Sequence, residues 1–241
     1  MKKLFLLVFS LYISSLSLSA QSSDIAISSK ALNSTIMLRV KSGTNRYNVC
    51  TGFFFNHNNE SYIVTAKHLF DSNIPNGETQ LFDFFYNDSW HSDQLKVYFH
   101  PNKYVDVAVI KINHYMQTGI IVSQGVILSQ KLFILGFPNN LRINAPKLSK
   151  KPFPVVKQGV LSAIISDEKF SDVILTDIVN NKGFSGGPAL MFDYKDKEWK
   201  VIGLVSGKMK NPNPEQIDFL EQGFTIIQPT SYFIEIIDAI E

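Results

Sequence analysis

Short β-type segments recur along almost the whole chain, and this repetition constrains the possible folds more than any other feature. Runs of apolar and β-branched residues alternate with turns rich in Gly, Pro and Asn, which is typical of strands. Long helical patterns do not alternate with these runs, which argues against a βαβ fold. The sequence therefore predicts an all-β sandwich or a pair of barrels. We expect about twelve strands, at 36–40, 50–55, 62–65, 95–99, 105–112, 119–127, 132–135, 158–165, 173–176, 189–192, 199–206 and 224–227.

One amphipathic helix is predicted at the end of the chain, over 230–241. Its apolar residues lie at i, i+3, i+4 and i+7. They are Phe233, Ile236, Ile237 and Ile240. The hydroxyl residues Thr230 and Ser231 come just before them, and either can cap the helix. We expect its apolar face to dock on the β-structure.

The first 20 residues have the organisation of a secretory signal peptide. Two lysines precede an apolar run over 4–13, and small residues follow over 14–20. The apolar run is shorter than the ~20 residues that span a bilayer. We expect cleavage after Ala20, an exported protein that is periplasmic or secreted, and no membrane span in the mature chain. Residues 21–33 are polar and Ser-rich, and we expect a flexible lead-in there.

The composition is that of a globular protein without excess charge. Hydrophobic residues make up 45% and charged residues 18% of the chain, which excludes a disordered tail. Removing Lys2 and Lys3 from the 23 basic residues leaves 21, equal to the 21 acidic residues. Because the mature chain is neutral and lacks a basic stripe, we expect no nucleic-acid partner. The single cysteine, Cys50, excludes an intrachain disulfide and a Cys-based metal site.

The segment GFSGGP at 183–188 is the most informative stretch for function. Glycines around Ser185 permit a sharp turn that exposes the hydroxyl and directs N–H groups toward one point. The segment also satisfies the G-x-S-x-G elbow of α/β-hydrolases, but that fold needs its histidine after the serine. All five histidines precede Ser185, which excludes the elbow and leaves the chymotrypsin order of His, Asp and Ser open.

His68 and Asp106 are the best candidates for a base and an acid that orients it. His68 closes the buried strand pattern 62–67, and Asp106 begins the apolar run 107–110. A desolvated carboxylate there needs a partner, and an imidazole N–H is suitable. We expect the remaining histidines to be solvated: His57, His91, His100 and His114. We expect the same of four acids in polar surroundings: Asp71, Asp83, Asp88 and Asp93.

Three blocks of the sequence together resemble the signature segments of trypsin-like serine proteases. They are TAKH at 65–68, DVAV at 106–109 and GFSGGP at 183–188, in the order of that family. Flanking segments such as TGF at 51–53 are most similar to the bacterial high-temperature-requirement branch.

The resemblance implies a trypsin-like peptidase domain over 34–241. Its fold would be two six-stranded antiparallel β-barrels with the active site between them and a C-terminal helix. The N-terminal barrel would cover about 34–120 and the C-terminal barrel about 121–228, with the helix at 230–241.

The resemblance also implies a role for each site residue. The protein would be a serine endopeptidase in which Ser185 forms an acyl-enzyme, His68 is the base and Asp106 orients it. The N–H groups of Gly183 and Ser185 would form the oxyanion hole. Val179 would form the base of the specificity pocket, while Ser206 and Gly207 would bind the substrate backbone. No metal or cofactor is needed, and the partners would be protein or peptide substrates.

Two other functions stay open on the sequence alone. Lys182 and Phe184 flank Gly183 where the bacterial relatives usually have Pro and Asn, so one alternative is a protease-fold binding protein without activity. The other is an esterase on the same fold, because acyl chemistry at Ser185 does not itself select amides.

Overall fold

The computed structural model describes residues 25–41, 47–117, 119–123, 125–144, 151–166, 171–206 and 223–241. The predicted signal peptide and Gly207 lie outside these residues. Of the helices that the structure describes, none combines the length and apolar composition needed to cross a bilayer.

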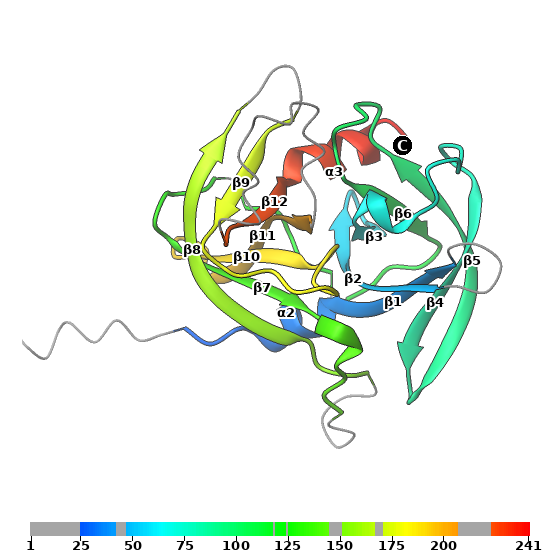
Figure 1. Ribbon diagram of the computed structural model, residues 1–241, viewed down its shortest axis with the longest axis horizontal. Helices are drawn as coiled ribbons and strands as arrows, with labels where there is room; N and C mark the ends of the chain where they lie inside the picture. Colours follow the sequence, from blue (N-terminus) through cyan, green and yellow to red (C-terminus); the bar gives the residue numbers. More distant parts are fainter. Residues whose placement is uncertain are drawn as a thin grey trace, which may run out of the picture.

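Twelve strands form two closed antiparallel barrels, as predicted (Figure 1). The N-terminal barrel has the order β1-β2-β3-β6-β5-β4, and the C-terminal barrel has the order β10-β11-β12-β9-β8-β7. The first contains β1 (Thr35–Lys41), β2 (Tyr47–His57), β3 (Glu60–Thr65), β4 (Thr79–Tyr86), β5 (Ser89–Phe99) and β6 (Ala108–Ile112). The second contains β7 (Lys131–Gly136), β8 (Val155–Ile165), β9 (Val173–Thr176), β10 (Pro188–Asp193), β11 (Glu198–Ser206) and β12 (Thr225–Pro229).

The β2–β3 hairpin leads the chain toward the site. Asn58 and Asn59 form its turn with φ of +44° and +64°, a conformation that asparagine tolerates and that matches the twist of paired strands. The hairpin register pairs Phe53 with Val64, and both side chains are buried. Directly after β3, the short 3₁₀ helix η1 (Lys67–Leu69) carries His68.

Two strand predictions were wrong. The described residues of 119–127 form no strand: Ile120 and Val122 make isolated parallel bridges to Phe55 and Val201, in the connection between the barrels. The sequence prediction also missed β4, where Asp83 interrupts the apolar pattern. That carboxylate is 2% exposed because it accepts hydrogen bonds from Arg39 of β1 and Ser92 of β5.

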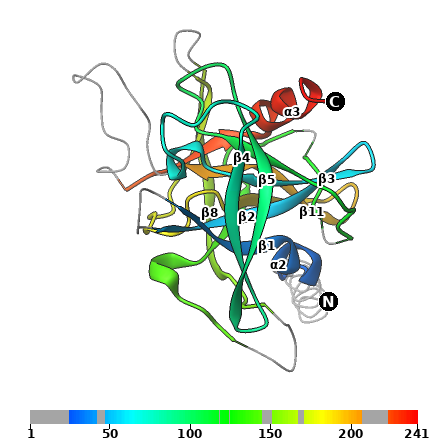
Figure 2. The same ribbon diagram turned by 90° about the vertical axis from the view of Figure 1, so that its right-hand side faces the viewer.

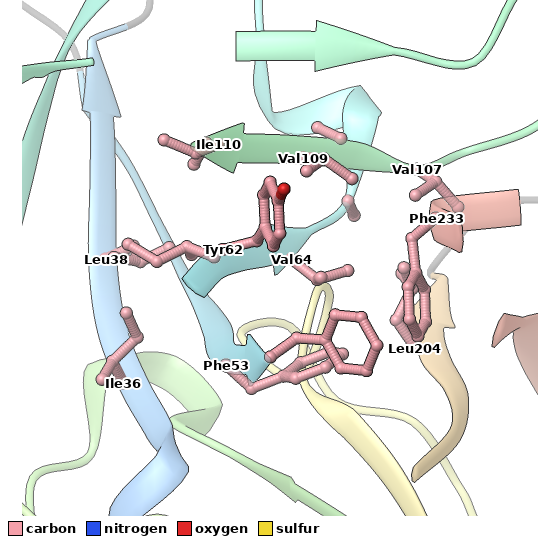
Figure 3. Packing of buried hydrophobic residues seen from close by; sticks show 14 of the residues in the cluster. Ile36, Leu38, Phe53, Tyr62, Val64, Val107, Val109, Ile110, Leu204 and Phe233 are labelled. Atoms are coloured by element: carbon pink, nitrogen blue, oxygen red, sulfur yellow. The ribbon is translucent and has the colours of Figure 1, made fainter. Parts of the chain in front are cut away.

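One hydrophobic cluster joins the N-terminal barrel to the C-terminal helix α3 (Thr230–Asp238). Phe233 of α3 is fully buried and packs edge-on against Phe53 and Phe55, with ring centroids 6.1 and 4.9 Å apart. Leu204 of β11 belongs to the same cluster, so the core continues into the C-terminal barrel (Figure 3). This continuity fixes the two barrels relative to each other.

The segment before β1 packs more closely than a flexible lead-in. Within the predicted lead-in, residues 25–33 are described, and α2 (Ser29–Ser34) lies beside β1 (Figure 2). Ala31 is fully buried, and the Trp199 indole N–H donates to the Ala26 carbonyl at 2.9 Å. The isoleucines among the serines explain this packing, because Ile25 and Ile27 are partly buried against the core.

Candidate active site

His68 and Asp106 meet through two hydrogen bonds. Asp106 Oδ1 accepts the backbone N–H of His68 at 2.7 Å, and Oδ2 lies 2.7 Å from His68 Nδ1. Because an ionised carboxylate can only accept, the imidazole proton sits on Nδ1, and Nε2 is left as an acceptor. Both residues were predicted from the sequence to lie on strands. In the structure His68 lies in η1, and Asp106 lies two residues before β6.

Burial holds the Asp106 carboxylate in place. The residue is 9% exposed, and the next residue, Val107, is fully buried in the cluster that contains Phe233 (Figure 3). A third donor, Ser206 Oγ at the end of β11, lies 2.6 Å from Oδ2. The predicted substrate-binding residue Ser206 therefore directs its side chain to the acid, and both barrels contribute donors to Asp106.

The loop that carries Ser185 requires its glycines. Gly183 and Gly186 have φ of +106° and +82°, a region that L side chains rarely adopt. A Cβ on Gly183 would lie 2.3 Å from the Phe137 carbonyl oxygen, and one on Gly186 would lie 2.2 Å from the Thr51 carbonyl oxygen. The loop folds tightly against both barrels, and only glycine fits at these two positions.

Two N–H groups of this loop are available for a ligand. Among the described residues, no acceptor pairs with the N–H of Gly183 or of Ser185. The Lys182 carbonyl accepts from the Asn139 N–H at 2.8 Å. Because a trans peptide points its carbonyl and N–H in opposite directions, the Gly183 N–H is directed away from Asn139.

A cleft of about 740 Å³ brings the predicted site residues together. His68, Val179, Gly183 and Ser185 all line it, whereas Gly207 lies outside the described residues. Within the described hydrogen bonds, none joins Ser185 Oγ to His68. Val179 is 62% exposed in the cleft. The described lining contains no carboxylate, but it does contain Lys182.

Two expectations about other polar residues were wrong. His100 is 8% exposed rather than solvated, because its Nε2 lies 2.8 Å from Glu235 Oε2 on α3 and its Nδ1 accepts the Asn102 N–H. Asp83 is buried with Arg39, as described above. Their partners are distant in sequence, so the polarity of the neighbouring residues did not predict that these side chains are buried. The predictions hold for the residues that are exposed: His91, His114, Asp71, Asp88 and Asp93.

One group of possible metal ligands occurs in the described part of the chain. It consists of His57, Asp238 and Glu241, whose ligand atoms lie within 4.8 Å of one another. Both acids are exposed, and His57 Nε2 already lies 3.3 Å from Asp238 Oδ1. None of the three lines the cleft with Ser185.

Two residues that hold the Ser185 loop have no role predicted from the sequence. Thr51 lies in the TGF segment that carried part of the family resemblance, and its hydroxyl donates to the Gly183 carbonyl at 2.7 Å. Asn139 holds the Lys182 carbonyl. The TGF motif was the available signal for Thr51, whereas Asn139 acts through its backbone and leaves no sequence signal.

The two six-stranded barrels, with a serine loop and His68 in one cleft and Asp106 bonded to His68, define the class of trypsin-like, chymotrypsin-fold serine proteases. Residues 50–204 match the family described as the trypsin-like peptidase domain, and the chain belongs to this family.

Solved structures show the same fold at low sequence identity. A serine endoprotease from Yersinia pestis superposes with a TM-score of 0.59 and 17% identity, covering 90% of this chain and 67% of that one. The active form of the Rv3671c protease from M. tuberculosis gives 0.57 and 14%, covering 86% and 81%. Its inactive form gives 0.56 and 15%, covering 87% and 90%. No curated protein sequence matches the chain.

Proposed function

We propose that this protein is a serine endopeptidase that cleaves peptide bonds through an acyl-enzyme on Ser185. His68 Nε2 takes the proton of Ser185 as Oγ bonds to the substrate carbonyl carbon. The proton then passes to the leaving amine as the C–N bond breaks. Water, activated by the same imidazole, hydrolyses the ester and restores Ser185.

The observation that carries this proposal is the hydrogen bond between His68 and Asp106, together with the cleft that His68 and Ser185 both line. A carboxylate that accepts a hydrogen bond from Nδ1–H fixes the tautomer that a general base needs and stabilises the imidazolium formed during attack. The backbone bond from His68 N–H to Asp106 Oδ1 fixes the carboxylate orientation as well. In this proposal the hydrogen bond between Ser185 Oγ and His68 Nε2 forms when substrate binds, because such catalytic hydrogen bonds commonly tighten in the substrate complex.

The unpartnered N–H groups of Gly183 and Ser185 supply the oxyanion hole in this proposal. Both groups flank the nucleophile, and no described acceptor competes for them. Each donor of this kind contributes about 3 kcal/mol to the transition state. A bulky Phe184 does not obstruct them, because its side chain is fully buried in the C-terminal barrel core.

We propose that cleavage follows apolar, mainly aliphatic, side chains. Val179 presents no charge to the cleft, and the Nζ of Lys157 donates to the Val179 carbonyl at 2.7 Å. A substrate Arg or Lys would find Lys182 but no carboxylate among the described lining residues. Burying an unpaired cation costs several kcal/mol. Asp177 does not compensate, because it is not among the described lining residues, and its Oδ1 accepts the Val160 N–H at 2.7 Å.

We further propose that the protein is exported, to a periplasm or out of the cell. The support is the basic start, short apolar run and small residues of 1–20. N-terminal sequencing of the protein recovered from the producing cell tests this, with Gln21 expected as the first residue.

The test of the peptidase activity compares wild type with Ser185→Ala and His68→Ala on a peptide library read by mass spectrometry. We expect the wild type to cleave and both variants to lose at least 10³-fold in kcat/KM, since the triad acts as a unit. The unfolding midpoints of all three should agree. A folded wild type that cleaves nothing would favour the binding protein. Hydrolysis of esters without any peptides would favour the esterase. Activity near wild type in Ser185→Ala would refute the assignment.

A further inference from the structure

Thr51 connects the N-terminal barrel to the serine loop of the C-terminal barrel. It lies in β2, opposite Met37 of β1, and is fully buried. Its backbone N–H donates to the Ser185 carbonyl at 3.1 Å, and its own carbonyl accepts from Thr65 Oγ1 at 2.8 Å. The residue is therefore fixed by its own barrel while it contacts the loop of the other.

The Thr51 hydroxyl uses both its donor and its acceptor across the barrel boundary. Oγ1 donates to the Gly183 carbonyl at 2.7 Å and accepts the Phe137 N–H at 3.1 Å. Since the Phe137 N–H can only donate, it directs the hydroxyl proton toward Gly183. The donor and acceptor roles at Oγ1 are thus assigned by its surroundings.

These bonds fix the two peptide planes on either side of Gly183. The Lys182–Gly183 peptide is held by the Asn139 N–H on the Lys182 carbonyl. The Gly183–Phe184 peptide is held at its carbonyl by Thr51 Oγ1 and at its N–H by the Asn181 carbonyl, 3.2 Å away. Gly183 is the flexible joint between these planes, at φ +106°. Rotation of the Lys182–Gly183 peptide, which carries the Gly183 N–H, would break the Asn139 bond, and a rotation that moved both planes would break the Thr51 bond as well.

We propose that Thr51 is a positioning residue for the oxyanion hole: its hydroxyl holds the Gly183 carbonyl and thereby aims the Gly183 N–H at the developing oxyanion. This inference rests on the proposed peptidase function. The N-terminal barrel thus supplies the base and its acid, and it also orders the electrostatic part of the site on the other barrel. The hydroxyl matters, because a methyl of equal size leaves the Gly183 carbonyl without its donor.

The experiment compares Thr51→Val, which keeps the shape and removes the hydroxyl, with Thr51→Ser, which keeps the hydroxyl. Loss of a whole oxyanion donor lowers kcat about 10²- to 10³-fold. For Thr51→Val, which loosens a donor without removing it, we expect a fall in kcat of roughly 10- to 100-fold with KM within about threefold. Thr51→Ser should stay within about threefold of wild type in kcat. The tetrahedral adduct of a peptide boronic acid with Ser185 places an oxygen in the oxyanion hole. The affinity of Thr51→Val for this inhibitor should therefore fall in proportion to its kcat/KM.

Several readouts separate positioning from a general loss of structure. Rates are counted per active site by titration to completion with a fluorophosphonate. Thr35→Val is the matched control, because Thr35 is also fully buried and donates to a carbonyl, that of Ala31 at 3.1 Å. It should leave kcat unchanged. If Thr51→Val does not fold, Thr51→Ala repeats the test without the hydroxyl.

Three results would overturn the inference while the peptidase proposal stands. They are an unchanged kcat in Thr51→Val, an equal loss in Thr51→Ser, or boronate affinity that does not follow kcat/KM. A folded wild type without activity would instead overturn the proposed function.

Discussion

Asp106→Asn should abolish most activity while leaving the fold intact, and the structure explains why the amide cannot adapt. The Oδ1 position must remain an oxygen, because it faces the backbone N–H of His68, which can only donate. The amide NH₂ then takes the Oδ2 position, 2.7 Å from Nδ1. Nδ1 must become an acceptor, so the proton moves to Nε2. The nitrogen that should receive the Ser185 proton is then already protonated.

The expected loss is large. In the serine protease triad this exchange of tautomers lowers kcat about 10⁴-fold, which corresponds to roughly 5 kcal/mol of transition-state stabilisation. Ser206 tolerates the change, because its hydroxyl can accept from the new NH₂ as readily as it donates to the carboxylate. We therefore expect a urea unfolding midpoint close to that of the wild type.

The assay is kcat on a fluorogenic peptide chosen from the library hits, with active sites titrated to completion. Asp83→Asn is the matched control, because Asp83 is equally buried and paired with Arg39 but lies away from the cleft. It should lose stability and keep its kcat per titrated site. A kcat of Asp106→Asn within tenfold of the wild-type kcat would refute the tautomer argument. A severe drop in the kcat of Asp83→Asn would show that kcat merely follows stability.

Two further predictions concern stability. Burial lowers the pKa of Lys151 from 10.5 to about 8, so the folded state releases this proton more readily than the unfolded chain, and the stability of the wild type rises with pH between about 8 and 10.5. In urea titrations, the stability of the wild type should therefore rise relative to that of Lys151→Met, which lacks the titrating group, by up to about 3 kcal/mol between about pH 7 and 10.5. A difference that is independent of pH would contradict the burial argument. Phe233→Ala should lose about 3–5 kcal/mol of unfolding free energy, because it removes a fully buried ring that packs on Phe53 and Phe55; a loss under 1 kcal/mol would show that α3 does not anchor the core.

The sequence sufficed for the fold and yielded the candidate site residues because both predictions rest on local signals. Strand alternation and Asn-rich turns are short-range features, and the blocks around His68, Asp106 and Ser185 are each only a few residues long. The fold prediction was confirmed. The roles of the three residues remain a proposal, supported by the cleft that His68 and Ser185 share and by the hydrogen bonds between His68 and Asp106.

What the sequence could not provide depends on partners that are distant along the chain. The residues around Asp83 predict a solvated acid, but in the fold β1 places Arg39, 44 positions away in sequence, beside it. His100 is buried by Glu235 of the terminal helix, 135 positions away. The apolar run 119–127 resembles a strand, but the bridges of its described residues are isolated ones, from Ile120 to Phe55 and from Val122 to Val201, which are distant in sequence. In the sequence Thr51 is indistinguishable from an ordinary strand residue, because its hydrogen-bond partners Gly183 and Phe137 belong to the second barrel.

The most direct measurement of the central claim is covalent labelling of the folded wild-type protein with a fluorophosphonate, mapped by mass spectrometry. An activated serine beside a base attacks phosphorus and expels fluoride, whereas an ordinary serine does not react. We predict one adduct per chain, on Ser185, and none in Ser185→Ala or after preincubation with a good peptide substrate analogue. A folded wild type that stays unlabelled, or an adduct on another residue, would contradict the account.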